Sequence, residues 1–105
     1  MAAADTFQPD LADITLPDVM HALGDEVRLR IVAELAASGE ERRCGTFDLG
    51  VSKATRSHHF RVLREAGITH TRVEGAARHV TLRREELETR FPGLLEAILA
   101  SAPSA

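Results

Sequence analysis

The residues that suggest chemistry are six basic side chains between positions 53 and 78, which stand against only Glu65 and Glu74. They give this segment a formal charge of +4, whereas the whole chain of 105 residues carries −3. Residues 1–52 hold ten acidic residues and four arginines, so the basic segment belongs to an otherwise acidic chain. Such a distribution indicates one surface directed at phosphate groups rather than a general affinity for polyanions. The alternative interpretation is a solvated helix face without a binding role.

One cysteine and five histidines are the candidates for metal or redox chemistry. Cys44 follows two arginines, which could lower the pKa of its thiol and make it a redox switch; an unreactive, half-buried thiol is the alternative. His58 and His59 are adjacent, so on a helix their side chains diverge by about 100° and do not chelate together. His70 and His79 could face each other across a hairpin and bind Ni²⁺ or Zn²⁺, or simply be exposed.

The elements that position these residues are predicted to be mainly helical. Ser52 is a good N-cap and Gly67 a good C-cap for a helix that carries much of the basic segment. Capping residues and apolar spacing predict two earlier helices, over residues 15–24 and 25–39. Within residues 39–51, Gly45 and Gly50 bracket a very short element that is expected to form only one or two helical turns.

The pattern changes after this helix. Alternating residues predict two short strands, around 68–72 and 78–82, with a turn at 74–77 between them. A helix follows over residues 85–91, and an apolar stripe at 94–99 indicates a last helix.

A basic helix followed at once by a hairpin is the layout of a winged helix-turn-helix, that is, mainly α with a small β-hairpin wing. A helix about 10–12 Å across fits the major groove of duplex DNA. The hairpin beside it could reach the neighbouring minor groove or backbone with Arg72 and Arg78. We expect one DNA-binding domain over residues 1–105, with residues 1–10 and 101–105 frayed.

Three stretches resemble the ArsR/SmtB family of small bacterial winged-helix transcriptional regulators. ALGDEVRLRIVAEL (22–35) resembles the first long helix of the family, and VSKATRSHHFRVLREAGI (51–68) resembles its recognition helix. RVEGAARHVTL (72–82) resembles the wing. Together the stretches span roughly residues 19–91, and the middle one is the most specific.

The resemblance implies roles for individual residues. His59 stands where the family has a structural histidine. Arg56 departs from the family, which usually has an apolar residue there; its head must reach solvent or pair with an acid. The DNA-binding residues implied in the recognition helix and the wing are Lys53, Thr55, Ser57, His58, Arg61, Arg72 and Arg78.

Two kinds of metal site are common in this family, and the sequence has neither. The Cys-x-Cys pair before the recognition helix is reduced to Cys44 alone, and the last helix contains no histidine. We therefore assign no cofactor from the family pattern. His70, His79 and Cys44 remain the candidates for binding Ni²⁺ or Zn²⁺.

The resemblance also implies a homodimer through the terminal helices, which would set two recognition helices on a palindromic site. The apolar stripe near the C-terminus exceeds what a small monomer is expected to bury, although the alternative is that it covers the chain's own core. The residues predicted at the dimer interface are Val19, Leu94, Leu95, Ile98 and Leu99.

Composition excludes several other classes. Hydrophobic residues make up 44%, but no apolar run approaches a membrane span, and one cysteine forms no internal disulfide. The N-terminus lacks a signal-peptide pattern, so we expect a cytoplasmic protein. No catalytic constellation is present, so we do not expect an enzyme. The sequence predicts a sequence-specific DNA-binding regulator; the alternative is a winged-helix subunit that acts mainly through a sensor or co-regulator protein.

Overall fold

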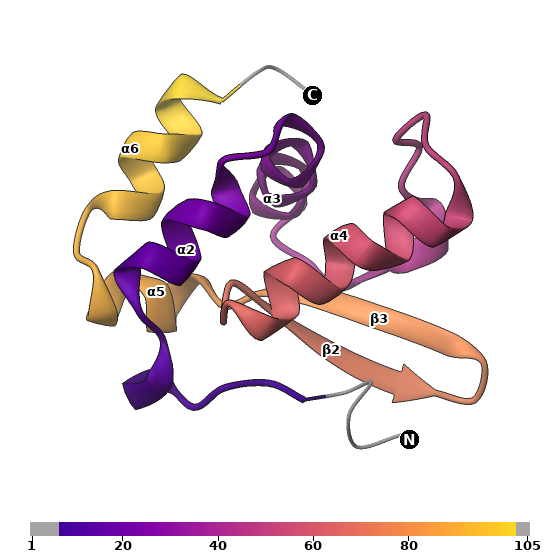
Figure 1. The fold of residues 1–105 in the computed structure, drawn as a ribbon, viewed down its shortest axis with the longest axis horizontal. Coiled ribbons are helices and arrows are strands. Elements are labelled where there is room, and N and C mark those ends of the chain that lie inside the picture. Colours follow the sequence, from indigo (N-terminus) through magenta and orange to yellow (C-terminus); the bar gives the residue numbers. More distant parts are fainter. Residues whose placement is uncertain (1–6, 103–105) are drawn as a thin grey trace.

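The structure is a computed structural model that describes residues 7–102. Residues 1–6 and 103–105, which belong to the ends predicted to be frayed, lie outside the described residues. Helices cover one face of a small sheet, and a long hairpin projects from it (Figure 1). The elements are a 3-10 turn (Leu11–Asp13), α2 (Leu16–Leu23), α3 (Glu26–Ser38), β1 (Arg42–Arg43), a second 3-10 turn (Cys44–Thr46), α4 (Lys53–Glu65), β2 (Thr69–Glu74), β3 (Ala77–Leu82), α5 (Arg84–Arg90) and α6 (Leu94–Ser101).

Three side-chain caps define where the first helices begin. Thr15, Asp25 and Ser52 each accept a hydrogen bond from the backbone N–H three residues later, at 3.3, 3.0 and 3.1 Å respectively. A cap of this kind stabilises a helix by about 1 kcal/mol because it satisfies an otherwise unpaired donor. Gly24 and Gly39 follow the last residues of α2 and α3. The predicted limits of these helices are therefore confirmed.

The sheet has three antiparallel strands in the order β1-β3-β2. β2 and β3 form the predicted hairpin, but its turn is two residues long, Gly75 and Ala76, and not the four predicted. Gly75 has a φ of 59°, which suits tight hairpin turns. β1 was not predicted: it has only two residues and pairs with β3, where Arg42 lies opposite Val80 and Arg43 opposite His79.

The core lies between the sheet and three helices. α3 packs on β3, α4 packs on β2, and α2 packs against both α3 and α4. The core side chains are mostly aliphatic, with Phe47 and Phe60 among them, in keeping with a chain that has four phenylalanines and no tryptophan or tyrosine. The most deeply buried side chains include Ile14, Ile31, Val32, Leu63, Ile68 and Val80.

Gly67 joins α4 to β2 in a conformation that other residues rarely adopt. Its φ is 87°, and a Cβ atom there would lie 2.5 Å from Cγ1 of Ile14. The glycine thus allows the chain to reverse direction directly against the core.

The segment 7–10, which was predicted to be frayed, is held against the sheet. The side chain of Gln8 accepts a hydrogen bond from the N–H of Thr71 at 2.6 Å and donates one to its carbonyl at 3.1 Å. Arg83 donates to the carbonyl of Pro9 at 2.8 Å, and Pro9 is buried. The prediction was wrong for these residues because the groups that hold them come from more than 60 residues away.

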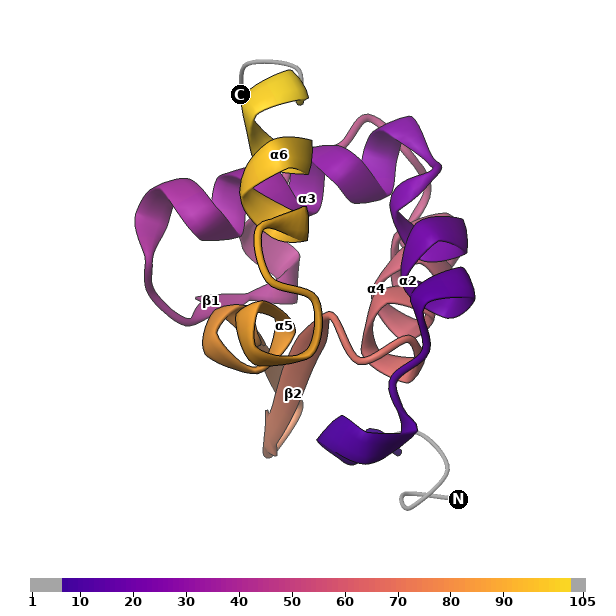
Figure 2. The ribbon, with the colours of Figure 1, turned by 90° about the vertical axis from the view of Figure 1, so that its left-hand side faces the viewer.

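The terminal helices lie at the end of the molecule opposite the hairpin tip (Figures 1 and 2). Val19 in α2 and Leu95 in α6 are 1% and 5% exposed and belong to the core of the chain itself. Their prediction as dimer contacts is corrected, because a side chain buried inside one protomer has no surface for a partner. Leu94, Ile98 and Leu99 are only partly buried against this core.

Together, the helices and the hairpin confirm the predicted winged helix-turn-helix fold.

Candidate nucleic-acid interface

The predicted recognition helix, α4, has one buried side and one exposed side. His59, Phe60 and Leu63 face the core, and the ring of Phe60 meets that of Phe47 edge-on at 5.2 Å. The exposed side carries polar residues at helical spacing. Every α4 residue predicted to contact DNA is exposed: Lys53, Thr55, Ser57, His58 and Arg61.

A groove of about 710 Å³ lies between α4, the Cys44–Thr46 turn and the hairpin. Phe60 and Thr71 contribute to its walls, and Ala76 and Ala77 line it near the hairpin tip. Among the described residues its lining includes no aspartate or glutamate. Six basic residues line it, namely Arg43, Lys53, Arg56, Arg61, Arg64 and Arg78.

The charge of this groove is largely uncompensated. Within residues 7–102, the side chains of Arg43, Lys53, Arg56 and Arg61 make no hydrogen bond or ion pair. Arg64 donates to the backbone carbonyl of Phe7 at 3.0 Å, a contact that orients its guanidinium at the groove wall. A concave surface lined by one sign of charge focuses the electric field and attracts polyanions. The groove therefore has the electrostatics of a phosphate-binding surface.

The structure brings some of the predicted site residues to this groove and leaves others outside it. Lys53, Ser57, Arg61 and Arg78 line the groove. Thr55 and His58 are exposed on α4 but lie outside the lining. The hydroxyl of Thr55 also accepts a hydrogen bond from Ser52 at 3.0 Å, beside the cap of the helix.

Arg72 lies on the opposite face of the hairpin from the groove. Its guanidinium donates to both carboxylate oxygens of Glu41, at 2.8 and 3.2 Å, and to Glu74 at 3.4 Å. The hydrogen bond from Arg72 holds the pKa of Glu41 below its usual value. Because side chains alternate across a strand, Arg72 faces away from the groove while Arg78, which lies opposite Val73, faces it. Of the two wing arginines predicted to contact DNA, Arg78 therefore lies at the groove and Arg72 lies on the other face of the hairpin.

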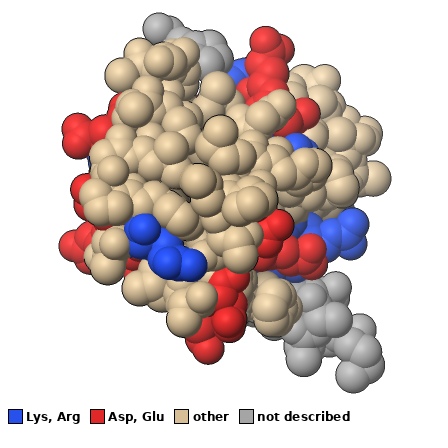
Figure 3. All heavy atoms as spheres, turned by 60° about the vertical axis from the view of Figure 1, so that its left-hand side comes forward, with Lys and Arg blue, Asp and Glu red and all other residues tan. Residues whose placement is uncertain are grey.

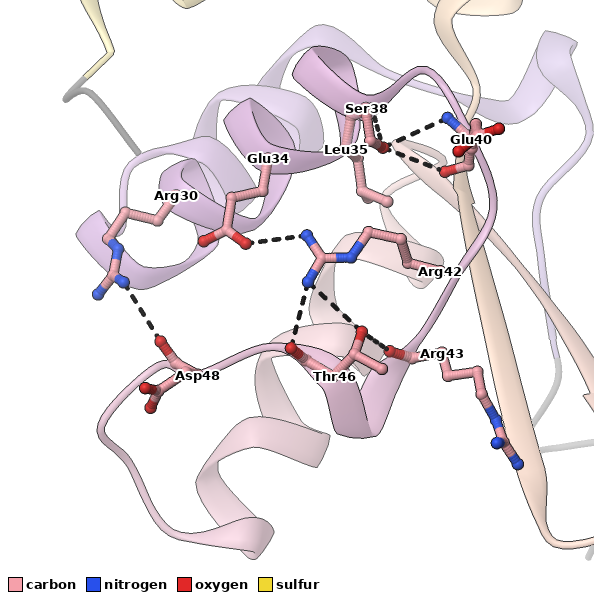
Figure 4. A network of polar contacts seen from close by, with 9 residues as sticks. All are labelled: Arg30, Glu34, Leu35, Ser38, Glu40, Arg42, Arg43, Thr46 and Asp48. Atoms are coloured by element: carbon pink, nitrogen blue, oxygen red, sulfur yellow. Dashed lines mark hydrogen bonds and ion pairs between the residues drawn. The ribbon is translucent and has the colours of Figure 1, made fainter.

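Arg43 is a groove residue that the sequence did not indicate. Figure 4 shows it next to Arg42 but pointing away from the polar contacts that Arg42 makes. Arg42 pairs with Glu34 at 2.9 Å, and its guanidinium lies 3.8 Å from the centre of the Phe47 ring. The signal that could have revealed Arg43 is strand alternation, but a strand of two residues is too short to show a period.

Arg56 is also part of the groove. The sequence placed it on the buried side of α4 with Phe60, where a charged side chain would be costly. In the structure it is half-buried at the groove wall, so its charge faces the groove and not the core. This position explains why α4 accommodates an arginine there.

Cys44 lines the same groove and is half-buried. Burial raises the pKa of its thiol, and the nearby guanidinium groups of Arg78 and Arg56 oppose this only in part. The prediction of a lowered pKa was wrong, because burial outweighs the opposing effect of the nearby arginines. At neutral pH the thiol is therefore mainly protonated, which disfavours oxidation.

The two hairpin histidines do not lie opposite each other. His70 pairs with Thr81 and His79 with Arg72, so they are diagonal neighbours on one face. His79 lies 3.5 Å from Glu74 and 3.8 Å from Glu41, within the ion pairs of Arg72. In the described part of the chain, no three His, Cys, Asp or Glu side chains are grouped so as to hold a metal ion.

His59 has the packed, hydrogen-bonded role that the family resemblance implied. It is 8% exposed, and its Nδ1 atom lies 3.0 Å from a guanidinium nitrogen of Arg28 in α3. Arg28 also donates to the carbonyl of Ala22 at 2.7 Å. Burial lowers the pKa of His59 below its usual value, and Asp25 at 3.8 Å opposes this. The contact fixes α4, and with it the groove, to the preceding helices.

Among the helices of residues 7–102, none has the length and apolar character needed to span a bilayer.

Residues 23–72, which include α3, β1, α4 and the beginning of β2, match the model of the family described as "Helix-turn-helix domain". The chain is also 42% identical over 82 residues to the "Uncharacterized HTH-type transcriptional regulator YceK" of Bacillus subtilis (strain 168). This match covers 76% of the chain and 82% of that protein. The chain therefore belongs to the helix-turn-helix family of DNA-binding transcriptional regulators.

Proposed function

We propose that the chain is a regulator of the ArsR type that binds duplex DNA with α4 in the major groove and the hairpin beside it. The observation that carries this proposal is the groove between α4 and the hairpin, which six basic residues and no acidic ones line. The match of the recognition-helix sequence to the ArsR/SmtB pattern supports the finer assignment.

Base reading is assigned to the exposed side of α4. Ser57, His58 and Arg61 lie at or near the middle of the helix and are exposed, so they can approach base edges. Lys53 and Arg78 suit phosphate contacts, since lysine and arginine are among the side chains that bind phosphate oxygens and position a protein on the duplex. Thr55 is assigned to a short phosphate contact near the N-terminus of α4.

The second part of the proposal is a homodimer through α2 and α6. Leu16 and Met20 are 46% and 54% exposed on α2, one helical turn apart. The face that includes this end of the molecule is mostly uncharged, with acidic residues around its edge and a basic patch in its lower part (Figure 3). An uncharged patch with a charged rim suits a protein partner. Two-fold pairing would present two α4 helices to successive major grooves.

The experiment is a binding titration by fluorescence anisotropy. The duplex is the DNA upstream of the protein's own gene, a scrambled duplex of the same length is the control, and the salt concentration is varied. We expect tighter binding to the upstream duplex and a steep fall in affinity with salt.

Equal affinity for both duplexes would contradict sequence-specific regulation from this site. Binding that appears only after a partner protein is added would favour the alternative, in which the chain acts through a sensor or co-regulator. Affinity purification of that partner from the native host would then identify it.

A further inference from the structure

The segment between α3 and the recognition helix α4 contains very little helix. In a helix-turn-helix the first helix crosses the DNA backbone while the second enters the major groove. Here α3 ends at Ser38 and α4 begins at Lys53, and the helical residues of the described chain between them are only Cys44–Thr46. A turn of three residues is too short to lie across a backbone as a helix does. Another part of the chain must make that contact.

Two arginines line the groove together with this short turn. Arg43 comes from β1, directly before the turn, and Arg56 comes from the first half of α4. Both line the groove, and within residues 7–102 neither side chain has a hydrogen bond or ion pair. They therefore present two uncompensated positive charges in one concavity.

The contacts of its neighbour Arg42 and the pairing of β1 with β3 fix the backbone at Arg43. Arg42 pairs with Glu34 at 2.9 Å and donates to the carbonyl of Thr46 at 3.2 Å, while the side chain of Arg43 points the other way (Figure 4). The backbone of β1 is paired with β3. A side chain that extends from a fixed backbone loses less entropy on binding than one on a flexible loop.

The geometry of duplex DNA indicates what enters the groove. The major and minor grooves are separated by one sugar-phosphate strand. If α4 lies in the major groove and the hairpin approaches the adjacent minor groove, that strand must pass between α4 and the hairpin. The basic groove occupies this space.

We infer that Arg43 and Arg56 form a clamp for the phosphates of this strand and supply the backbone contact of the reduced first helix. This inference rests on the proposed DNA-binding function. The clamp positions the protein on the duplex and does not read sequence, because phosphates are the same at every base pair.

The test compares Arg43→Ala, Arg56→Ala and the double variant with the wild type by anisotropy on the upstream and scrambled duplexes. Each lost phosphate contact lowers the slope of log affinity against log salt by about 0.9. We expect the double variant to lose about 1.8 in slope per protomer. Its affinity should fall by a similar factor on both duplexes, so that their ratio is preserved.

Arg84→Ala is the matched control, because Arg84 is exposed on α5 and does not line the groove. It removes the same charge and should leave the slope unchanged. The double lysine variant should retain the slope, because lysine also neutralises phosphate. Circular dichroism melting must show that each variant folds.

Three results would overturn the inference. The first is a folded double variant with the slope of the wild type, and the second is a loss equal to that of Arg84→Ala. The third is a loss confined to the upstream duplex, which would indicate base reading. If the wild type itself shows no salt-dependent DNA binding, the proposed function is wrong and the clamp is wrong with it. If the wild type binds DNA but the double variant keeps the same slope, only the clamp is wrong.

Discussion

A guanidinium nitrogen of Arg28 lies 3.0 Å from Nδ1 of His59, a buried contact between α3 and α4. Since arginine only donates hydrogen bonds, His59 must accept at Nδ1, and an imidazole that accepts there is neutral. Two further contacts of Arg28, with the carbonyls of Ala22 and His21, fix the guanidinium in place. The position of the recognition helix therefore depends on the protonation state of one histidine.

This dependence predicts that the folded protein loses stability in mild acid. Burial lowers the pKa of His59 in the folded state, whereas in the unfolded chain it is about 6.5. Above pH 6.5 both states hold a neutral ring and the contact is intact. As the pH falls from 6.5 to the folded-state pKa, the unfolded state binds more protons, so the free energy of unfolding decreases.

Urea unfolding of the wild type between pH 7.5 and 5.5 measures this effect. His59→Gln keeps an acceptor but does not titrate, so its stability should depend less on pH in this range. The control is His58→Gln, which changes the exposed neighbour and should retain the dependence of the wild type. Parallel curves for wild type and His59→Gln would contradict the prediction.

Arg61 and Arg72 both belong to the basic segment 53–78, but their replacement should affect DNA affinity differently. Arg61 is exposed at the groove and has no partner among residues 7–102, whereas Arg72 is paired with Glu41 and Glu74 on the other face. We expect Arg61→Ala to weaken binding to the upstream duplex by about 1–3 kcal/mol, if Arg61 contacts a base. Arg72→Ala should have a much smaller effect. Anisotropy at one salt concentration compares them, and equal losses would argue against the assignment of the groove face.

The thiol of Cys44 should react slowly and be protected by DNA. Burial raises its pKa, so the reactive thiolate is scarce at pH 7.5. Labelling with 5,5′-dithiobis(2-nitrobenzoic acid) should be slower than that of free glutathione. Since Cys44 lines the groove, saturating duplex should slow it further. A labelling rate that duplex leaves unchanged would place the DNA elsewhere on the molecule.

The proposed dimer predicts that a charge on α2 produces monomers. Met20 is 54% exposed, so Met20→Glu should be tolerated by the fold of one protomer but introduce a charge into the interface. Sedimentation velocity should show a dimer for the wild type and a monomer for this variant. Val51→Glu is the control, because Val51 is also an exposed apolar residue but lies two residues before α4, away from α2 and α6 in the sequence. A wild type that sediments as a monomer at tens of micromolar would reject the dimer.

Much of the helical architecture could be predicted because its determinants are local. The caps at Thr15, Asp25 and Ser52 bind backbone N–H groups only three residues away. The glycines at the ends of α2 and α3 directly follow the last helical residue. The basic segment that lines most of the groove was visible as a charge pattern. These signals are contained in short windows of sequence, so they could be interpreted without knowing the fold.

The features that escaped prediction depend on contacts between distant residues. β1 exists only because β3, more than 30 positions later, offers it an edge. Segment 7–10 is ordered by Thr71 and Arg83.

The sequence by itself determined that a basic, capped helix is followed by a hairpin, because helix caps, apolar periods and turns are local properties. Only the tertiary structure decided which basic residues share one surface. Strand register directs Arg78 into the groove and Arg72 away from it, while the pairing of β1 with β3 brings Arg43 to the groove that Arg56 also lines. Such choices depend on which strands meet and in what register, and residues far apart in the chain settle them together.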